Sequence, residues 1–417
     1  MIAPVSGVQL DPLEVAWAIP LGEEPAVGAL PQSSVKGARL ALEQVVRRAL
    51  LRPPCVVSFS GGRDSSAVLA LAVLVARREG LAEPIPVTNR FAAVPSADER
   101  DWQELVVRHL RLSDWTCLEL TDELDMLGPA AVDILHRHGV LAPFNSHFHV
   151  PLLALAPGGS LLTGIGGDEV FEPTDRAPLG RLLYGRALPS RRQLKPLALA
   201  TLPRSIRRLR LASEPAFKSY GWLRREARIE IARRYADWMA DEPISYQASM
   251  RTWWWRSRVL QCNLDAKRLL ARDLNVEIHH PFADPDVLLA YGADRGRLGP
   301  PGRVWAIREL FGDLLPQAVI ERESKSTFNG AFWTGAALPF VERWGGEGVD
   351  TDLVDIRRLR DEWMRPEPSP HSFALLQQAF LADCSGRRPR GTEVAGQAVT
   401  TAAAPILRRR PSAPPRR

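Results

Sequence analysis

The chain has 417 residues, of which 45% are hydrophobic, enough for a large buried core and for two or three domains. It shows neither a membrane-length apolar run nor a secretory signal, so we expect no membrane contact. The net charge is +6, but residues 386–417 hold eight arginines and one acid, which is +7. The rest of the chain is therefore close to neutral, which argues against nucleic-acid binding. We expect residues 386–417 to form a disordered basic tail, either solvated or docked on an acidic partner.

The cysteine spacing bears on the cellular setting. The four cysteines are widely scattered and form neither a CxxC pair nor a zinc-binding spacing. A reduced, cytoplasmic protein without structural disulfides is the expected setting.

The first half of the sequence alternates between strand and helix patterns. Residues 1–33 form an N-terminal extension with a weak strand signal at 15–19, and Ser34 is placed to cap a helix. The expected strands that follow are 55–59, 85–89, 116–120 and 161–163, and the expected helices are 65–79, 98–110 and 129–138. This alternation predicts an α/β fold with a parallel sheet covered by helices on both faces.

The second half reads as mainly helical. Strand signals vanish after about residue 180, and helices are expected at 220–240 and 248–272. We therefore divide residues 34–385 into an α/β part, 34–180, and a mainly helical part, 181–385. The Trp253–Trp255 run cannot lie on one helix face, and we expect it to pack in the core or in part to line a substrate cleft.

One segment, residues 55–66, combines a buried strand, a glycine turn and a helix start. Backbone N–H groups and the positive helix end make such a turn a site for phosphate. Asp64 would repel a bare phosphate, so its expected role is to bind Mg²⁺ beside one. The residues expected to bind nucleotide here are Ser58, Ser60, Gly61, Gly62, Asp64, Ser65 and Ser66.

A second segment, residues 160–171, repeats the pattern of a strand running into a glycine turn with carboxylates. Gly164, Gly166 and Gly167 are expected to approach the nucleotide, and Asp168 is expected to share Mg²⁺ with Asp64. Ligands bind at the carboxyl edge of parallel sheets, where both turns would lie. Helix capping by the two aspartates is the alternative.

The motifs resemble those of a known family. The SGGxDSS sequence at 60–66 resembles the loop of enzymes that cleave ATP into AMP and pyrophosphate, and it lacks the Gly-Lys-Ser/Thr of a Walker loop. Residues 164–171 resemble GxGxDE(L/V)F, residues 276–284 resemble GxExRxPFxD, and residues 303–328 resemble K-x-x-L-R-x-x-F…LP…R-x-K-x-x-F. These four blocks, in this order, are similar to the synthetase domain of the asparagine synthetase family, which includes β-lactam synthetases and lasso-peptide cyclases.

The resemblance implies further site residues and the cofactors ATP and Mg²⁺. Lys325 would hold pyrophosphate and stabilise the charged transition state, with Arg322 beside it. Arg303 stands where the family often has Lys and would touch the nucleotide. Glu277 would support catalysis or form a structural salt bridge, and Asp284 would cap a turn or contact substrate.

Residue 165 departs from the family pattern. Asparagine synthetases place an acidic residue there and β-lactam synthetases a Tyr, whereas this chain has Ile165. A positioned base is worth roughly 10²–10⁴-fold in rate, so either another group takes that role, or the chemistry differs, or the site is impaired. The candidates near the motifs are Glu277, Asp284, Glu169, His279 and His280.

The resemblance also implies a reaction. We expect an ATP-dependent ligase that activates a carboxylate as an acyl-adenylate and joins it to an amine, with lasso-type macrolactam formation as the most concrete version. The sequence offers no glutaminase domain or N-terminal cysteine, so ammonia would be free or delivered by a partner, or the substrate would carry its own amine. A leader-binding partner protein would accompany peptide cyclisation. The alternatives are ammonia-dependent asparagine synthesis and a catalytically impaired nucleotide-binding partner.

Overall fold

The structure is a computed structural model that describes residues 9–31, 37–172, 174, 176–184, 194–213, 220–324, 327–386 and 409–411. The strands are β1 (Cys55–Ser58), β2 (Ile85–Phe91), β3 (Thr116–Leu120), β4 (Ser160–Leu162), β5 (Glu277–His279) and β6 (Arg409–Pro411). The helices of the first half are α1 (Pro12–Trp17), α2 (Ala38–Leu50), α3 (Arg63–Glu79), α4 (Arg100–Leu110), α5 (Pro129–His138), α6 (Val150–Leu153), α7 (Gly167–Phe171) and α8 (Ala177–Tyr184). Those that follow are α9 (Leu194–Thr201), α10 (Arg204–Ala212), α11 (Arg225–Ala240), α12 (Tyr246–Ala248), α13 (Arg258–Asp273), α14 (Pro285–Arg295), α15 (Arg303–Phe311), α16 (Gln317–Ile320), α17 (Leu338–Arg343), α18 (Ile356–Trp363) and α19 (Phe373–Gly386).

Short helical turns connect these elements. They are η1 (Pro95–Ala97), η2 (Ser146–His149), η5 (Ser249–Trp254), η6 (Pro281–Ala283), η7 (Asn329–Phe332) and η8 (Pro370–Ser372). Of the helices in the described ranges, none combines the length and the apolar character that crossing a membrane requires.

The sheet has the strand order β5-β4-β1-β2-β3-β6, and its first five strands are parallel. The predicted parallel α/β sheet is thereby confirmed. In the register of the central strands, Val57 of β1 lies opposite Leu162 of β4 and Pro86 of β2. The turns after β1 and β4 therefore leave the sheet at the same edge and side by side.

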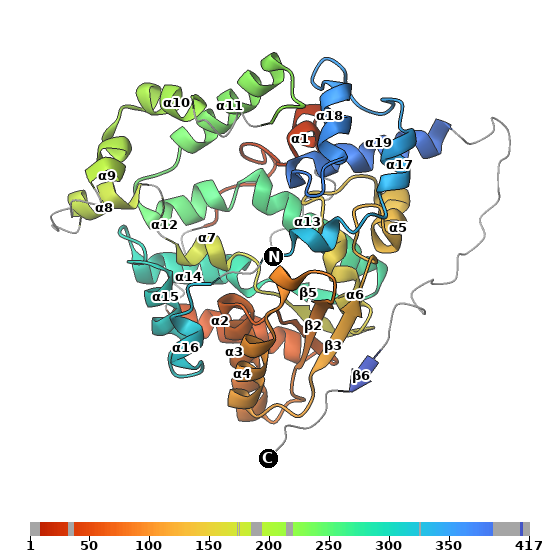
Figure 1. The fold of residues 1–417 in the computed structure, drawn as a ribbon. Helices are drawn as coiled ribbons and strands as arrows, with labels where there is room; N and C mark the ends of the chain where they lie inside the picture. The colour runs from red at the N-terminus through yellow and green to blue at the C-terminus, as the bar shows by residue number, and fades with distance from the viewer. Residues whose placement is uncertain are drawn as a thin grey trace.

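Alternate side chains of β1 enter two different cores. Cys55 and Val57 pack with the apolar faces of α2 and α3, whereas Val56 packs with α5 and α6. Because successive strand residues point to opposite faces, this double burial produces the continuous apolar run seen in the sequence. Figure 1 shows α2, α3 and α4 together in the lower part of the molecule, beside the sheet.

A helix replaces the strand expected at 15–19. Asp11 accepts a hydrogen bond from the N–H of Glu14, and the Glu14 carboxylate accepts one from the N–H of Asp11. This reciprocal capping box, with Pro12 in the first turn, starts α1. The strand expected at 15–19 is therefore wrong, because the capping box starts a helix that runs to Trp17.

A strand that the sequence did not predict, β5, extends the sheet beyond β4. It is only three residues long, too short for a period-two pattern to stand out. The helices around it also return to the α/β part: α13 packs against β5, α14 against α2 and α15 against α3. Elements of the second half of the chain therefore complete the α/β layer.

Two further differences concern element ends. Helix α2 begins at Ala38, where Asp294 accepts the backbone N–H bonds of Gly37 and Ala38; Ser34 lies outside the described residues. Residues 248–272 do not form one helix, because the π-helical turn η5 precedes α13, which Ser257 caps. The three tryptophans at 253–255 are all buried, which confirms the core packing expected for them.

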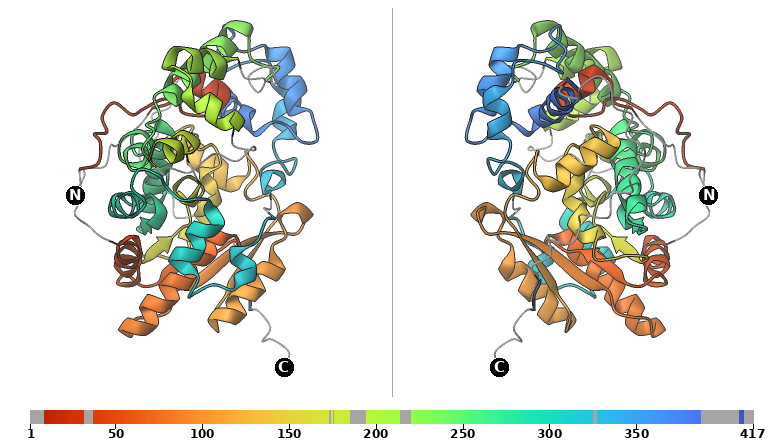
Figure 2. Two further views of the ribbon diagram at one scale, coloured as in Figure 1. Left: turned by 90° about the vertical axis from the view of Figure 1, so that its left-hand side faces the viewer. Right: turned by 90° about the vertical axis from the view of Figure 1, so that its right-hand side faces the viewer.

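The remaining helices form a second layer. In Figure 1, α8 to α11 and α17 to α19 lie in the upper part of the molecule, with α1 among them. Both side views in Figure 2 place this layer above the sheet. At the opposite end, residues 409–411 pair antiparallel with β3, so the predicted tail contains a strand that the sequence did not indicate.

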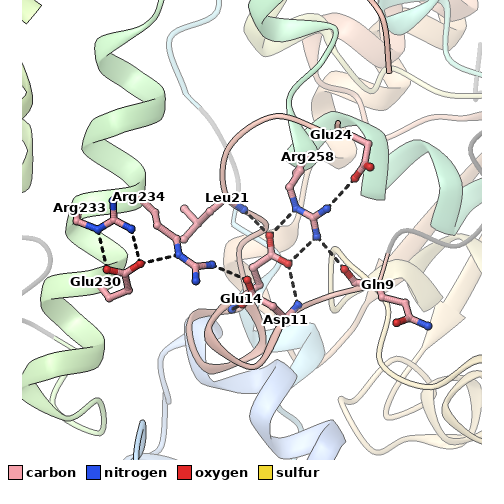
Figure 3. A network of polar contacts seen from close by, with 9 residues as sticks. All are labelled: Gln9, Asp11, Glu14, Leu21, Glu24, Glu230, Arg233, Arg234 and Arg258. Atoms are coloured by element: carbon pink, nitrogen blue, oxygen red, sulfur yellow. Dashed lines mark hydrogen bonds and ion pairs between the residues drawn. The ribbon is translucent and has the colours of Figure 1, made fainter. Parts of the chain in front are cut away.

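A network that we call the N-terminal latch fastens residues 9–24 to α11 and α13 (Figure 3). Its centre is Arg258, whose guanidinium binds both oxygens of Glu14 and one oxygen of Glu24, all at 2.7 Å. The members of the latch are Gln9, Asp11, Glu14, Leu21, Glu24, Glu230, Arg233, Arg234 and Arg258.

Candidate active site

The turn after β1 is held open by its own serines. The Ser60 hydroxyl accepts the N–H of Gly62 at 3.3 Å and lies 3.0 Å from the hydroxyl of Ser65. Ser65 in turn accepts the N–H of Ser60 and donates to the carbonyl of Gly62. These bonds fix a loop at the start of α3, so its shape does not depend on a ligand. A fixed loop of this kind at a helix N-terminus is suited to hold phosphate.

Gly61 is required by the close approach of α4. Its φ is +85°, and a Cβ there would lie 2.9 Å from a carbon of the Gln103 side chain. Gln103 also donates to the carbonyl of Ser60. A side chain at position 61 would thus push the loop away from the helix that supports it.

The turn after β4 packs directly on Asp64. A Cβ on Gly167 would lie 2.5 Å from the carboxyl carbon of Asp64, and one on Gly164 would lie 3.0 Å from the N–H nitrogen of Ser65. Gly166 has φ +96°, and its backbone lies against Phe282 and Ala283. The glycines of the second turn are therefore the reason that the two aspartates come together.

Arg303, the first residue of α15, lies between the two aspartates. One guanidinium nitrogen contacts Asp168, and the other lies 2.5 Å from Asp64. Its side chain is only 12% exposed. Two carboxylates from separate turns thus converge on one cation. This donor set suits Mg²⁺, a hard cation that binds one or two carboxylates together with phosphate oxygens and water.

The protein supplies no complete metal cage here. Within the described residues, no group of three His, Cys, Asp or Glu side chains is placed to hold a metal. Asp64 and Asp168 would therefore be the protein ligands of the predicted metal, and substrate oxygens would complete its shell. Arg63 lines the same cavity, and burial and the nearby Arg303 lower its pKa, with burial the larger cause.

Arg322 lies beneath the nucleotide loop. It forms a buried ion pair with Glu99, donates to the carbonyl of Gly61 at 3.2 Å and lies 4.8 Å from the ring centre of Trp102. The sequence suggested a catalytic role for this residue. Its contacts hold the loop in place, and its side chain also lines the cavity, so the catalytic role stays a prediction. Lys325, predicted to hold pyrophosphate, lies outside the described residues.

A cavity of about 630 Å³ opens between the two turns. Its polar lining comes from the turns and from Arg63, Arg303 and Arg322, and its apolar lining includes Ile165 and three phenylalanines, Phe148, Phe328 and Phe332. Phe148 packs against both Phe328 and Phe332 with ring centres 6.3 and 6.2 Å apart. The cavity therefore joins a phosphate-binding end to an aromatic wall.

Most of the predicted nucleotide-binding residues reach or shape this cavity. Its lining includes Ser58, Ser60, Gly62, Asp64, Ser65, Gly164, Gly166 and Asp168. Gly61 and Gly167 shape it from behind. Ser66 is a correction: it is 0% exposed and faces the core, because the helical turn carries it away from the loop.

Glu277 is a second correction. It lies at the amino end of β5, opposite Ser160, and pairs with Arg52 at 3.1 Å rather than lining the cavity. The structural salt bridge, which the sequence left open, is thus the arrangement found. Asp284 caps α14 by accepting the N–H of Asp286, as expected. Of the proposed replacement bases, only Glu169 lines the cavity, while His280 binds Thr163 behind it.

The segment formed by Asn145 and η2 also contributes to the cavity. Asn145, Phe148 and His149 line the cavity although no recognised motif contains them. The local pattern that marks this segment is the pair of histidines, His147 and His149, shortly before Pro151.

Comparison with known families agrees with the site geometry. The family described as Asparagine synthase matches residues 37–381, which includes both glycine turns, Arg303 and Arg322. No curated protein matches the chain in sequence.

Proposed function

Because the chain belongs to the asparagine synthase family, whose members are ATP-dependent carbon–nitrogen ligases, we propose that it joins the carboxylate of a peptide or a specialised amino-acid derivative to an amine. The carboxylate is activated as an acyl-adenylate with release of pyrophosphate. Intramolecular closure of a peptide into a macrolactam, as in lasso-type biosynthesis, is the specific form of this proposal.

The phosphate end of the cavity supports the adenylation step. The N–H groups in the first turn of α3 would hold phosphate oxygens, and Arg63 and Arg303 would face the charge that develops on pyrophosphate. Mg²⁺ bound by Asp64 and Asp168 would neutralise part of this charge. Arg303 already contacts both aspartates, so metal binding requires it to turn toward the phosphates.

The aromatic wall is the observation that carries the choice of substrate. Ile165, Phe148, Phe328 and Phe332 line the cavity, and Phe148 packs against both Phe328 and Phe332. Burial of apolar substrate groups against apolar walls is favourable, whereas burial of an unpaired charge there is costly. Free aspartate carries three charges and suits such a wall poorly, whereas a peptide segment with apolar side chains suits it well.

ATP–pyrophosphate exchange tests the proposal directly. The panel is the twenty amino acids, their N-acetyl forms, and a linear peptide with a free amino terminus and one internal carboxylate. We expect the peptide to support exchange and to yield a product lighter by one water. Fast exchange with aspartate, followed by asparagine formation from ammonium, would replace the proposal with asparagine synthesis. Absence of exchange with every member would indicate a nucleotide-binding partner without turnover.

Variants of Asp64 and Asp168 distinguish a loss of catalysis from a loss of folding. Asp64→Asn and Asp168→Asn are each expected to lower the exchange rate by about 10²–10³-fold, because charge at the developing pyrophosphate is lost. Asp284→Asn is the matched control, since this carboxylate caps α14 and does not line the cavity. Equal loss in all three variants would contradict the assignment of the metal site.

A further inference from the structure

One lysine is buried with no carboxylate partner among the residues that the structure describes. Lys267, on α13, is 2% exposed, and among the described residues it forms no ion pair. Burial is the one cause that acts on its pKa, which falls to about 7. A buried lysine that gains nothing from an anion is costly, so its position calls for an explanation beyond packing.

Three imidazoles lie within electrostatic range of this lysine. Lys267 contributes to lowering the pKa of His147, His149 and His280, after the larger effect of burial in each case. Helix α13 packs directly against η2, which carries His147 and His149. His280 lies 2.7 Å from the hydroxyl of Thr163, a residue that lines the cavity. The cluster is therefore basic throughout and adjoins the cavity from behind.

His149 is the member of the cluster that reaches the cavity. It is part of the wall, it is 9% exposed, and its Nδ1 is buried without a hydrogen-bond partner. Its tautomer is thus not fixed by the protein, and the ring is free to take up a proton. The carboxylates on the same wall are engaged differently: Asp64 and Asp168 contact Arg303, and Glu99 contacts Arg322.

We propose that His149 accepts the proton released when the amine attacks the acyl-adenylate, and that Lys267 is the positioning residue that keeps this imidazole neutral. This inference rests on the proposed ligase function. In the step, the amine nitrogen bonds to the acyl carbon, and the bond from that carbon to the phosphate oxygen breaks. The electron pair leaves with AMP, and the proton passes from nitrogen to the imidazole.

The electrostatics of the cluster suit this role. Burial, then Lys267, then His280 hold the pKa of His149 well below 6.5, so the ring is an unprotonated acceptor at neutral pH. Helix α5, which also packs against η2, contributes no group that acts on His149. Once the amine has bonded to carbon, its nitrogen is strongly acidic, and even a weakly basic imidazole removes its proton. Glu169, exposed on the same wall, is the competing base.

The test compares two half-reactions in the full chain. Adenylation is followed by ATP–pyrophosphate exchange with the best carboxylate of the panel above. Acyl transfer is followed by amide formation with methoxyamine, a weakly basic amine that stays unprotonated across the neutral range. We expect His149→Ala to keep its exchange and to lose transfer by about 10²–10⁴-fold. Added imidazole is expected to restore part of the transfer, because the truncated side chain leaves room for it in the cavity.

His147→Ala is the matched control. This buried imidazole lies two residues away and binds the carbonyl of Leu124 instead of lining the cavity. We expect it to alter the melting temperature without reducing transfer relative to exchange. Two results would overturn the inference while exchange still supported the ligase. One is intact acyl transfer in His149→Ala, and the other is a loss of transfer in this variant that added imidazole does not restore. A loss confined to Glu169→Gln would assign the base to that residue.

Lys267→Met tests whether Lys267 controls the protonation of His149. Removing the cation raises the pKa of His149. When the rate of acyl transfer is plotted against pH, its fall on the acidic side is therefore expected to move to higher pH. An unshifted fall would contradict the role of Lys267. Absence of exchange in the wild-type chain with every carboxylate would instead refute the proposed function, and this inference with it.

Discussion

Two arginines in this molecule each lie between two carboxylates, and their surroundings differ. In the N-terminal latch, Arg258 binds Glu14 and Glu24, and the Glu14 carboxylate also accepts the N–H groups of Asp11 and Leu21. At the candidate active site, Arg303 binds Asp64 and Asp168 at the wall of a cavity. The first arrangement is satisfied entirely by protein groups, while the second faces space that a ligand can enter.

The difference shows how the same ion-pair chemistry serves folding or function. In the latch, every contact is made in the folded chain, so the groups have nothing further to bind. At the cavity, Gly164 and Gly167 leave out the side chains that would otherwise fill the space around Asp64. The Arg303 guanidinium that contacts the aspartates can therefore be replaced by Mg²⁺ that arrives with the nucleotide. The comparison leads to four predictions.

The largest effect is expected from Arg258→Met. It leaves two carboxylates, Glu14 at 2% and Glu24 at 11% side-chain exposure, without their cation. Breaking a buried pair from one side costs roughly 3–5 kcal/mol, so the free energy of unfolding should fall by about 5 kcal/mol. Urea unfolding measures it, and Mg²⁺ should restore none of the loss. A change below about 1 kcal/mol would mean that the latch is no more than a surface contact.

Lys267→Met is expected to act in the opposite direction, because no carboxylate among the described residues pairs with this cation. The folded pKa of Lys267, about 7, lies below the ordinary value of 10.5, which corresponds to roughly 4–5 kcal/mol. Between these two values the unfolded chain binds more protons, so wild-type stability rises with pH. The variant should therefore be more stable by about 4 kcal/mol at neutral pH. This advantage should disappear as pH approaches 10.5.

Unfolding curves for both chains across this pH range measure the effect. A stability gap that stays constant with pH would show that Lys267 remains charged in the folded chain. Its cost would then come from packing rather than from a shifted proton equilibrium.

A smaller and reversible effect is expected from Arg303→Met. The two aspartates it contacts are 16% and 49% exposed, so water screens them in part. The unfolding free energy should fall by about 1 kcal/mol or less, and millimolar Mg²⁺ should recover it. Calorimetry should also show weaker Mg–ATP binding, by roughly tenfold. If Mg²⁺ raises the melting temperature of this variant no more than that of Arg258→Met, the two sites do not differ as proposed.

The smallest effect is expected from Gly167→Ala, which adds a single methyl group. Gly167→Ala would place a Cβ 2.5 Å from the carboxyl carbon of Asp64, so the turn must shift and Mg–ATP affinity should fall by a few-fold to tenfold. Gly28→Ala, in the N-terminal segment, is the control because no atom lies within 4 Å of its Cβ. Equal nucleotide affinity in both variants would show that the second turn does not position Asp64.

Much of the fold was readable from sequence. The alternation of apolar runs and helical periods predicted the four strands β1 to β4 and the parallel sheet, because burial on both faces leaves a continuous apolar signature. The apolar pattern gave the wrong element at α1, where the capping box is the stronger signal. It missed β5, because a strand of three residues is too short to show a pattern. The two glycine turns were also found, since parallel strands bring their carboxyl ends to one edge.

The sequence by itself therefore determined the α/β order and the residue types of the nucleotide end of the site. Only the tertiary structure decided which distant groups meet there. Arg303 reaches Asp64 across 239 positions of chain, and Arg322 reaches Gly61 across 261. Glu277 was removed from the site and His149 was added to it. The physical reason is that local patterns report which face of an element is buried, whereas side-chain encounters depend on how whole elements pack.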